Sequence, residues 1–146
     1  MCYTEIVKEY TRRRLCGRCL CFWRFSVQHI EDTEQTLVIR WAELQLCKYP
    51  DLEMLFHIPN GGKRNAREAA RFKQMGVKAG VPDLFLAAPR GTFHGLFIEM
   101  KSPKGTVREN QKKWLKKLAK QGYDTAVCHG FEEARDKIIE YILREN

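Results

Sequence analysis

Three residues near the middle of the chain carry side chains that could act together on a phosphate. Asp83 follows a proline and opens an apolar run, while Glu99 and Lys101 close the next apolar run. Side chains along a strand alternate between the two faces of a sheet, so Glu99 and Lys101 would share one face, opposite Met100. If the two runs pair as a hairpin, Asp83 returns to the same edge. Two carboxylates and one lysine would then converge there.

Such a cluster has the chemistry of a metal-dependent hydrolase. Two close carboxylates repel each other unless a cation lies between them. Hard oxygen ligands select Mg²⁺ or Mn²⁺, and such an ion can polarise a phosphodiester. A neighbouring lysine could orient or deprotonate the attacking water, or neutralise developing negative charge. The alternative is an exposed ion pair between Glu99 and Lys101, which would contribute little. A single Glu-x-Lys motif is weak, and the pattern alone leaves both readings open.

Hydrophobic periodicity and turn residues predict the elements that must position these side chains. The expected elements are a helix at 31–48, a strand at 53–58, a helix from the N-cap Asn65 to Met75, strands at 83–87 and 96–101 joined by a five-residue loop, a helix that starts at a capping box of Thr106 with Glu109 and runs to Gln121, a buried strand at 125–128, and a helix at 131–143. This order predicts an α/β fold with a mixed β-sheet flanked by helices.

The first 28 residues do not follow this periodicity. They are basic and contain Cys16, Cys19 and Cys21, and we expect them to form an appendage to a single domain at residues 29–146. Deleting them should leave that domain folded and active. The chain offers no second cysteine pair, which favours reduced thiols over a structural zinc site. No apolar run approaches the ~20 residues of a membrane span, and no signal peptide is evident, so we expect a cytoplasmic protein.

The charge distribution indicates a polyanionic partner, with DNA as the first candidate. The net charge is +8, and the excess lies in residues 60–80 and 101–120. The candidate phosphate contacts are Lys63 and Arg64 after the turn at 60–62, and Lys112, Lys113, Lys116 and Lys117 on one side of a helix. The alternatives are a plain turn and a solvated helix face.

Gln111 lies on the other side of that helix, in a stripe with Trp114, Leu115 and Leu118. A glutamine in an apolar stripe requires a buried hydrogen-bond partner, unless it marks the edge of the stripe. It could bind the attacking water, a carboxylate or a phosphate.

The context of these residues resembles the PD-(D/E)xK nuclease superfamily. More narrowly, the chain from residue 31 to 142 resembles the VRR-NUC domain of phages and bacteria. The segments that carry the resemblance are Ile-Pro-Asn-Gly-Gly-Lys-Arg at 58–64, Gly-Val-Lys-Ala-Gly-Val-Pro-Asp-Leu-Phe at 76–85, His-Gly-Leu-Phe-Ile-Glu-Met-Lys at 94–101, and Gln111. It covers about three quarters of the chain, and residues 76–101 are its specific part.

This resemblance implies a restriction-endonuclease-like core and a metal-dependent DNA endonuclease selective for branched, flap or junction DNA. Asp83, Glu99 and a glutamate of the first helix would hold Mg²⁺ or Mn²⁺, Lys101 would be the catalytic lysine, and Gln111 would belong to the active site. A homodimer would suit a two-fold junction. The competing hypotheses are a non-catalytic DNA-binding module with the same fold, and a cysteine-rich interaction protein.

Two glutamates compete for the first-helix position. Helical geometry places Glu34 near the middle of the apolar stripe formed by Leu37, Val38 and Trp41, with Glu31 at its edge. The resemblance instead favours Glu31, because similar phage sequences place a glutamate four residues before a glutamine and ten before a tryptophan. A metal site lies at the rim of a core, so the edge position is acceptable, and we predict Glu31 as the ligand.

Overall fold

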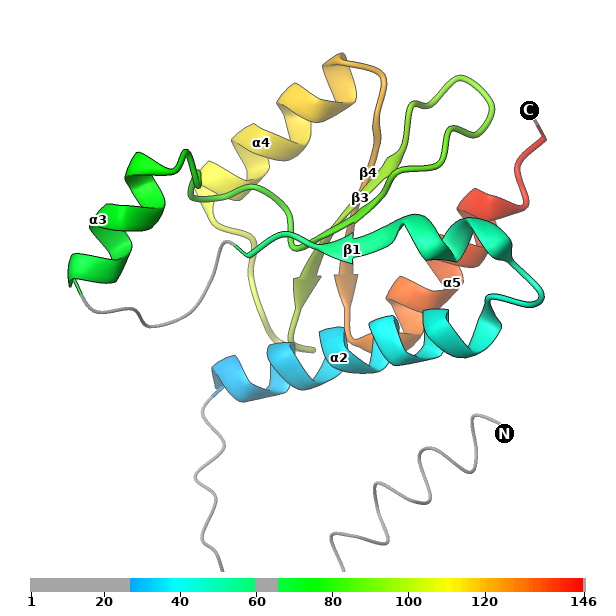
Figure 1. The fold of residues 1–146 in the computed structure, drawn as a ribbon, viewed down its shortest axis with the longest axis horizontal. Helices are drawn as coiled ribbons and strands as arrows, with labels where there is room; N and C mark the ends of the chain where they lie inside the picture. Colours follow the sequence, from blue (N-terminus) through cyan, green and yellow to red (C-terminus); the bar gives the residue numbers. More distant parts are fainter. Residues whose placement is uncertain (1–26, 60–65, 146) are drawn as a thin grey trace, which may run out of the picture.

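The structure, a computed structural model, describes residues 27–59 and 66–145 of the 146-residue chain, with side chains from residue 32 onward except at position 66. Asn65 and the proposed appendage, apart from its last two residues, lie outside the described part. The elements in chain order are α2 (Val27–Gln45), the 3₁₀-helix η1 (Pro50–Met54), β1 (Leu55–His57), α3 (Ala66–Gln74), β2 (Leu84–Leu86), β3 (Leu96–Lys101), α4 (Glu109–Lys120), β4 (Asp124–His129) and α5 (Phe131–Ile142) (Figure 1).

The strands form one mixed four-stranded sheet in the order β1-β2-β3-β4. β1 pairs with β2 and β2 with β3 in antiparallel fashion, whereas β3 and β4 are parallel. A parallel pair needs a crossover connection, and α4 provides it. The predicted α/β class and mixed sheet are therefore confirmed, as is the hairpin of β2 with β3. The hairpin connection spans residues 87–95, longer than the expected five-residue loop.

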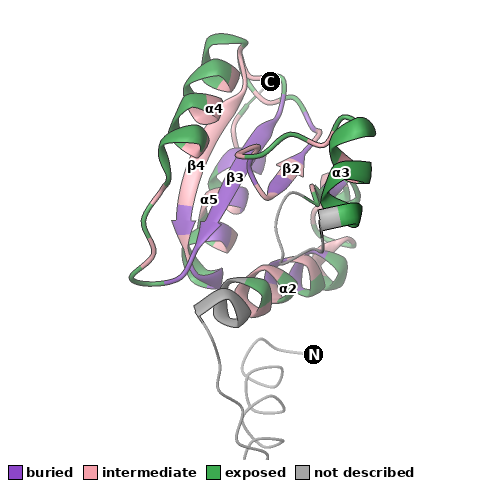
Figure 2. Ribbon diagram, turned by 90° about the vertical axis from the view of Figure 1, so that its left-hand side faces the viewer, coloured by how far each residue is buried: buried purple, intermediate pink, exposed green. Residues whose placement is uncertain are grey.

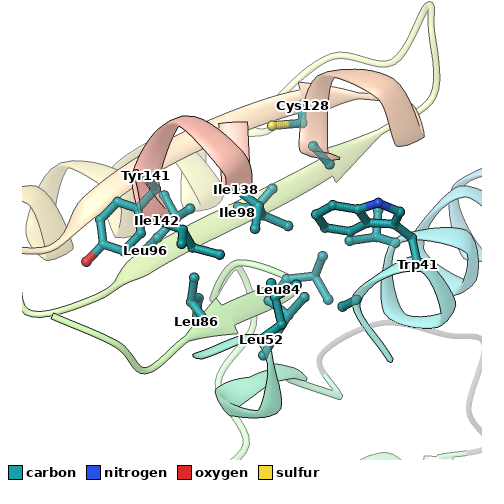
Figure 3. Close-up of a cluster of buried hydrophobic side chains, with 14 of the residues drawn as sticks. Trp41, Leu52, Leu84, Leu86, Leu96, Ile98, Cys128, Ile138, Tyr141 and Ile142 are labelled. Atoms are coloured by element: carbon teal, nitrogen blue, oxygen red, sulfur yellow. The ribbon is translucent and has the colours of Figure 1, made fainter. Parts of the chain in front are cut away.

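One face of the sheet packs against α2 and α5, and the main hydrophobic core lies there. Its members are buried residues from strands and helices, including Val38, Trp41, Leu84, Leu86, Leu96, Ile98, Met100, Ile138 and Tyr141. Figure 3 shows most of these side chains meeting between the strands and the two helices. The hydroxyl of Tyr141 donates a hydrogen bond to the carbonyl oxygen of Ala88 at 2.8 Å, so the buried phenol keeps a hydrogen-bond partner inside the core.

The other face of the sheet is covered by α4, which packs against β4. The stripe of Gln111, Trp114, Leu115 and Leu118 is half-buried, and the lysines between these positions are exposed, as the periodicity predicts. Figure 2 shows β3 buried along its length and α4 exposed on its outer side. The side chains of β3 are therefore buried on both faces of the sheet.

Two further sequence expectations were wrong in detail. The helix after β3 starts at Glu109 rather than directly after Thr106, because the side chain of Gln111 accepts a hydrogen bond from the N–H of Arg108 and caps the helix there. The strand expected to be buried at 125–128 is an edge strand, in which Cys128 is buried and the other residues are half-exposed. Burial raises the pKa of the Cys128 thiol to about 12, so it stays a neutral core group.

None of the helices in the described part of the chain is long and apolar enough to cross a membrane.

Candidate active site

The hairpin of β2 and β3 brings the two predicted carboxylates together. The register pairs Leu84 with Ile98, so the next position along the hairpin places Asp83 opposite Glu99. The ladder continues on the other side, where the N–H of Ile58 donates to the carbonyl of Asp83 at 2.8 Å. Backbone pairing thus fixes the position of Asp83, which lies one residue before the start of β2. Local strand pairing, rather than a loop, determines the separation of the two acids.

Glu99 is fully buried, with an exposed fraction of 0%. Its Oε1 accepts hydrogen bonds from the Nζ of Lys101 at 2.6 Å and from the Nε2 of Gln111. Its Oε2 accepts no hydrogen bond from the described residues. A buried carboxylate oxygen without a donor is costly, and its persistence calls for a cation or substrate that supplies the missing partner.

Asp83 is oriented by the backbone of the strand opposite. Its Oδ2 accepts a hydrogen bond from the N–H of Met100 at 3.0 Å, which fixes the carboxylate at the end of β3. The Nδ1 of His57 lies 2.8 Å from the carbonyl oxygen of Asp83. The N–H of Met100 was missed by the sequence reasoning; extending the hairpin register by one residue would have revealed it.

Both carboxyl groups are held in an environment that disfavours their charge. Burial raises the pKa of Glu99 to about 7, and the neighbouring carboxylate of Asp83 contributes in the same direction. Burial also raises the pKa of Asp83, against the opposing effects of the Met100 N–H and of the Lys101 charge. A cation bound between two such carboxyl groups would stabilise their charged forms.

The ammonium of Lys101 is buried in the same cluster, with its side chain 8% exposed. It donates to Glu99 and, at 2.7 Å, to the carbonyl oxygen of Met100. The exposed strand-end ion pair that the sequence left open is therefore excluded. An ammonium has three donors, and among the described residues these two contacts use two of them, which leaves one for a ligand.

Gln111 has the buried partner that its position in the apolar stripe required. Its amide oxygen accepts from the N–H of Arg108 at 2.9 Å, and its amide nitrogen donates to Glu99. The side chain thus joins the first turn of α4 to the carboxylate. The same end of α4 is held by the indole N–H of Trp114, which donates to the carbonyl of Ala79 at 3.2 Å.

The first-helix glutamates are placed differently. The backbone of Glu31 lies in α2, and its side chain is outside the described part of the structure. Glu34 is half-buried, and its Oε2 accepts a hydrogen bond from the N–H of Phe131 at 2.7 Å. Glu34 therefore binds the first residue of α5, which is a structural task on the core side of the sheet.

The predicted DNA-contacting residues fall into two groups. Lys63 and Arg64 lie outside the described residues. The four α4 lysines that were predicted to contact DNA, at positions 112, 113, 116 and 117, are all exposed. Lys112 forms an ion pair with Glu109 at 2.8 Å, and the Nζ of Lys117 lies 5.9 Å from the centre of the Trp114 ring.

The described residues supply part of a metal site. Asp83 and Glu99 offer hard oxygen donors, one of them unpartnered and buried, and this donor set suits Mg²⁺ or Mn²⁺. No group of three or more histidine, cysteine, aspartate or glutamate residues that could hold a metal occurs within the described ranges. A third histidine, cysteine or carboxylate ligand would have to come from a side chain outside those ranges.

Comparisons with known proteins identify the family of the chain. The VRR-NUC domain family matches residues 29–132. Among solved structures, a VRR_NUC domain protein superimposes with a TM-score of 0.68 and is 39% identical, over 80% of this chain and 91% of that chain. No significant match was found among curated proteins.

Proposed function

The chain belongs to the VRR-NUC family of nucleases, and from this premise we propose that it is a metal-dependent endonuclease that hydrolyses phosphodiester bonds in DNA, with selectivity for branched, flap or junction structures. The observation that carries the proposal is Glu99. Glu99 is a fully buried carboxylate beside a second carboxylate and a buried lysine, and none of the described residues donates to its Oε2, which is costly for a group with a structural role alone. It suits a site that is completed by a cation and a phosphate.

In this proposal Asp83 and Glu99 hold Mg²⁺ or Mn²⁺, with Glu31 as a third ligand. When bound, the ion supplies Lewis-acid stabilisation of negative charge on the reacting phosphate. The residues of the chain prepare that position. The Met100 N–H orients Asp83, and Gln111 and Lys101 together occupy one oxygen of Glu99, which directs the other oxygen to the ligand.

Lys101 acts on the water and the phosphate. Its contacts to Glu99 and to the Met100 carbonyl fix the ammonium, and the remaining N–H can bind the attacking water or a phosphate oxygen. Placing a fixed positive charge where negative charge develops accelerates phosphoryl transfer without reorganisation of the site. We assign Gln111 as a positioning residue, since it touches Glu99 and not the reacting atoms.

The basic surface holds the DNA backbone in this proposal. The exposed lysines of α4 start at the residue after Gln111 and continue along the helix, away from the carboxylates. Lysine contacts to phosphates fix the position of a nucleic acid without reading its sequence. Lys63 and Arg64 would contribute a second set of phosphate contacts.

The test combines a cleavage assay with a readout of metal binding. Wild type should cleave at least one of a panel of linear, flap and four-way junction DNAs when Mg²⁺ or Mn²⁺ is present. Asp83→Asn should not cleave, should bind DNA as wild type does, and should lose the rise in melting temperature that Mn²⁺ causes in the wild type. Cleavage by Asp83→Asn at the wild-type rate would overturn the assignment. Tight DNA binding by a wild type that cleaves nothing would instead indicate a non-catalytic module.

A further inference from the structure

Three phenylalanine side chains lie side by side across the sheet on the same face as Glu99. The strand register pairs Phe56 of β1 with Phe85 of β2, and Phe85 with Phe97 of β3. The rings of Phe85 and Phe97 are stacked, with centroids 4.2 Å apart, and the Phe56 ring meets Phe85 edge-on at 5.6 Å. We call these three residues the phenylalanine ladder.

The ladder lies directly beside the proposed catalytic cluster. Phe97 precedes Glu99 by two residues and Phe85 follows Asp83 by two, so each pair lies on one face of its strand. Two residues along a strand span about 6.6 Å. The carboxylates and the ladder therefore form successive rungs of the same sheet face, separated by about the length of one nucleotide unit.

The ladder passes from buried to exposed across the sheet. Phe97 is buried, and Tyr123 lies against both Phe97 and Phe85 at this inner end, 5.2 Å and 5.9 Å away between ring centroids. At the outer end Phe56 is 48% exposed on an edge strand. The inner end of the ladder therefore lies toward β4, the strand against which α4 packs.

The backbone near the ladder is adapted to the ring of Phe85. A Cβ atom at Gly95 would lie 2.7 Å from Cε2 of Phe85 and 2.8 Å from the carbonyl oxygen of Leu86, so only glycine fits beside this ring. Phe56 lies on a three-residue edge strand and is half-exposed, so its ring buries less apolar surface than the inner rings of the ladder do. The exposed part of this ring is accessible to a ligand.

We propose that the outer end of the ladder, Phe56 with the adjoining edge of Phe85, stacks an unpaired base of the nucleic-acid substrate. This inference rests on the proposed function, because a phosphate at Asp83 and Glu99 places the neighbouring base over the ladder. Bases within a duplex are already stacked on both faces, whereas an unpaired base offers its π-face to an aromatic ring. The basic side chains near the site, Lys101 beside Glu99 and the exposed lysines of α4, supply charge complementary to the phosphate backbone that carries such a base. The preferred substrate then carries an unpaired nucleotide next to the bond that is cleaved.

The experiment compares ring and non-ring substitutions of Phe56 in the full chain. Phe56→Leu keeps apolar bulk on the strand but removes the ring, and Phe56→Trp restores a stacking surface. Leu143→Ala is the matched control, because Leu143 is 63% exposed and lies at the end of α5. The probes are a blunt duplex and the same duplex with one unpaired 2-aminopurine, titrated without divalent metal so that cleavage does not interfere.

We expect wild type, Phe56→Trp and Leu143→Ala to quench the 2-aminopurine fluorescence on binding. Phe56→Leu should lose the quenching and bind the unpaired probe about tenfold more weakly, with its affinity for the blunt duplex unchanged, because stacking strengthens binding to each unpaired base. Equal affinities of Phe56→Leu and wild type for the unpaired probe, or equal losses on both probes, would overturn the inference. If wild type cleaves with Mg²⁺ but shows no quenching, the ladder assignment fails and the nuclease assignment stands. If quenching depends on Phe56 but no DNA is cleaved, the nuclease assignment is the one that fails.

Discussion

The two faces of β3 differ in what their burial achieves. Leu96, Ile98 and Met100 point toward α2 and α5 and are enclosed by apolar side chains. The alternate residues, Phe97, Glu99 and Lys101, are also buried, on the α4 face. On that face the strand ends in a charged cluster that includes an unpartnered carboxylate oxygen. The same six-residue strand thus serves a closed core and an incomplete site.

This contrast shows how the fold separates stability from chemistry. The α2–α5 face gains stability from apolar burial, about 25 cal/mol for each Å² removed from water. On the α4 face, burial raises the pKa of both Glu99 and Asp83, so ionising these carboxyl groups opposes folding. Proteins retain such unfavourable interactions at functional sites, where the surrounding structure holds the groups in place. Substitutions on the two faces should therefore have separable effects.

The largest expected effect is on cleavage, from Lys101→Ala on the α4 face. Removing the ammonium removes the fixed charge beside Glu99, and the cleavage rate should fall by about a thousandfold while DNA binding stays within a few-fold of wild type. Single-turnover cleavage and gel-shift titrations measure the two quantities.

Met100→Leu on the opposite face is the matched control for Lys101→Ala. A volume-conserving apolar exchange costs less than about 1.5 kcal/mol, so its cleavage rate should remain close to wild type. A Lys101→Ala protein that cleaves at the wild-type rate would show that the lysine serves the fold only, and that the two faces do not differ as described.

The reverse pattern is expected for Ile98→Ala, which creates a cavity in the core. Ile98 is fully buried, and truncating such a residue lowers the free energy of unfolding by about 2–5 kcal/mol. Denaturant unfolding measures this loss. Cleavage per folded molecule, assayed well below the melting transition, should be unchanged. A large loss of activity in a protein that is still fully folded would mean that the core face also sets the geometry of the site.

The sequence predicted which residues come together at the site better than it predicted the contacts that they make there. Alternation along β3 and the proline before Asp83 were enough to bring the acids and Lys101 together. The partner of Gln111 was left open, because a stripe position indicates a need for a partner and not its identity. The start of α4 was wrongly predicted at Thr106. The observed cap is a hydrogen bond from the N–H of Arg108 to the side chain of Gln111, and this side chain is positioned by its second contact, to Glu99. Edge position of β4 depends on strand order, which local periodicity does not specify.

A smaller effect separates the two glutamates of α2. Glu34→Gln should lower the free energy of unfolding by about 0.5–1 kcal/mol, because the amide oxygen can still accept from Phe131 while the charge at the start of α5 is lost. Glu31→Gln should instead raise the Mn²⁺ concentration needed for half-maximal cleavage and lower the maximal rate. Urea unfolding and metal titrations of both variants give the comparison. If Glu34→Gln abolishes cleavage and Glu31→Gln does not, the sequence spacing was misleading and the helical stripe was the better guide.

The smallest expected effect concerns the outer surface of α4, where each lysine contributes a screened contact. Lys113 and Lys117 are exposed, whereas Lys112 is engaged by Glu109, so the double variant Lys113→Ala/Lys117→Ala is the cleanest way to remove phosphate contacts from this surface. The slope of log K against log salt for duplex DNA should decrease by about 0.9 for each lost contact, hence by about 1.8 for both. Arg40→Ala/Lys48→Ala removes the same charge from exposed positions in and after α2, on the other side of the sheet, and should leave the slope within about 0.3 of wild type if only long-range charge is changed. Equal slopes for the two double variants would mean that net charge, rather than the α4 surface, attracts the DNA. A decrease confined to the α4 variant, with its cleavage rate at saturating DNA unchanged, would place the backbone on the same face as Glu99 and Lys101.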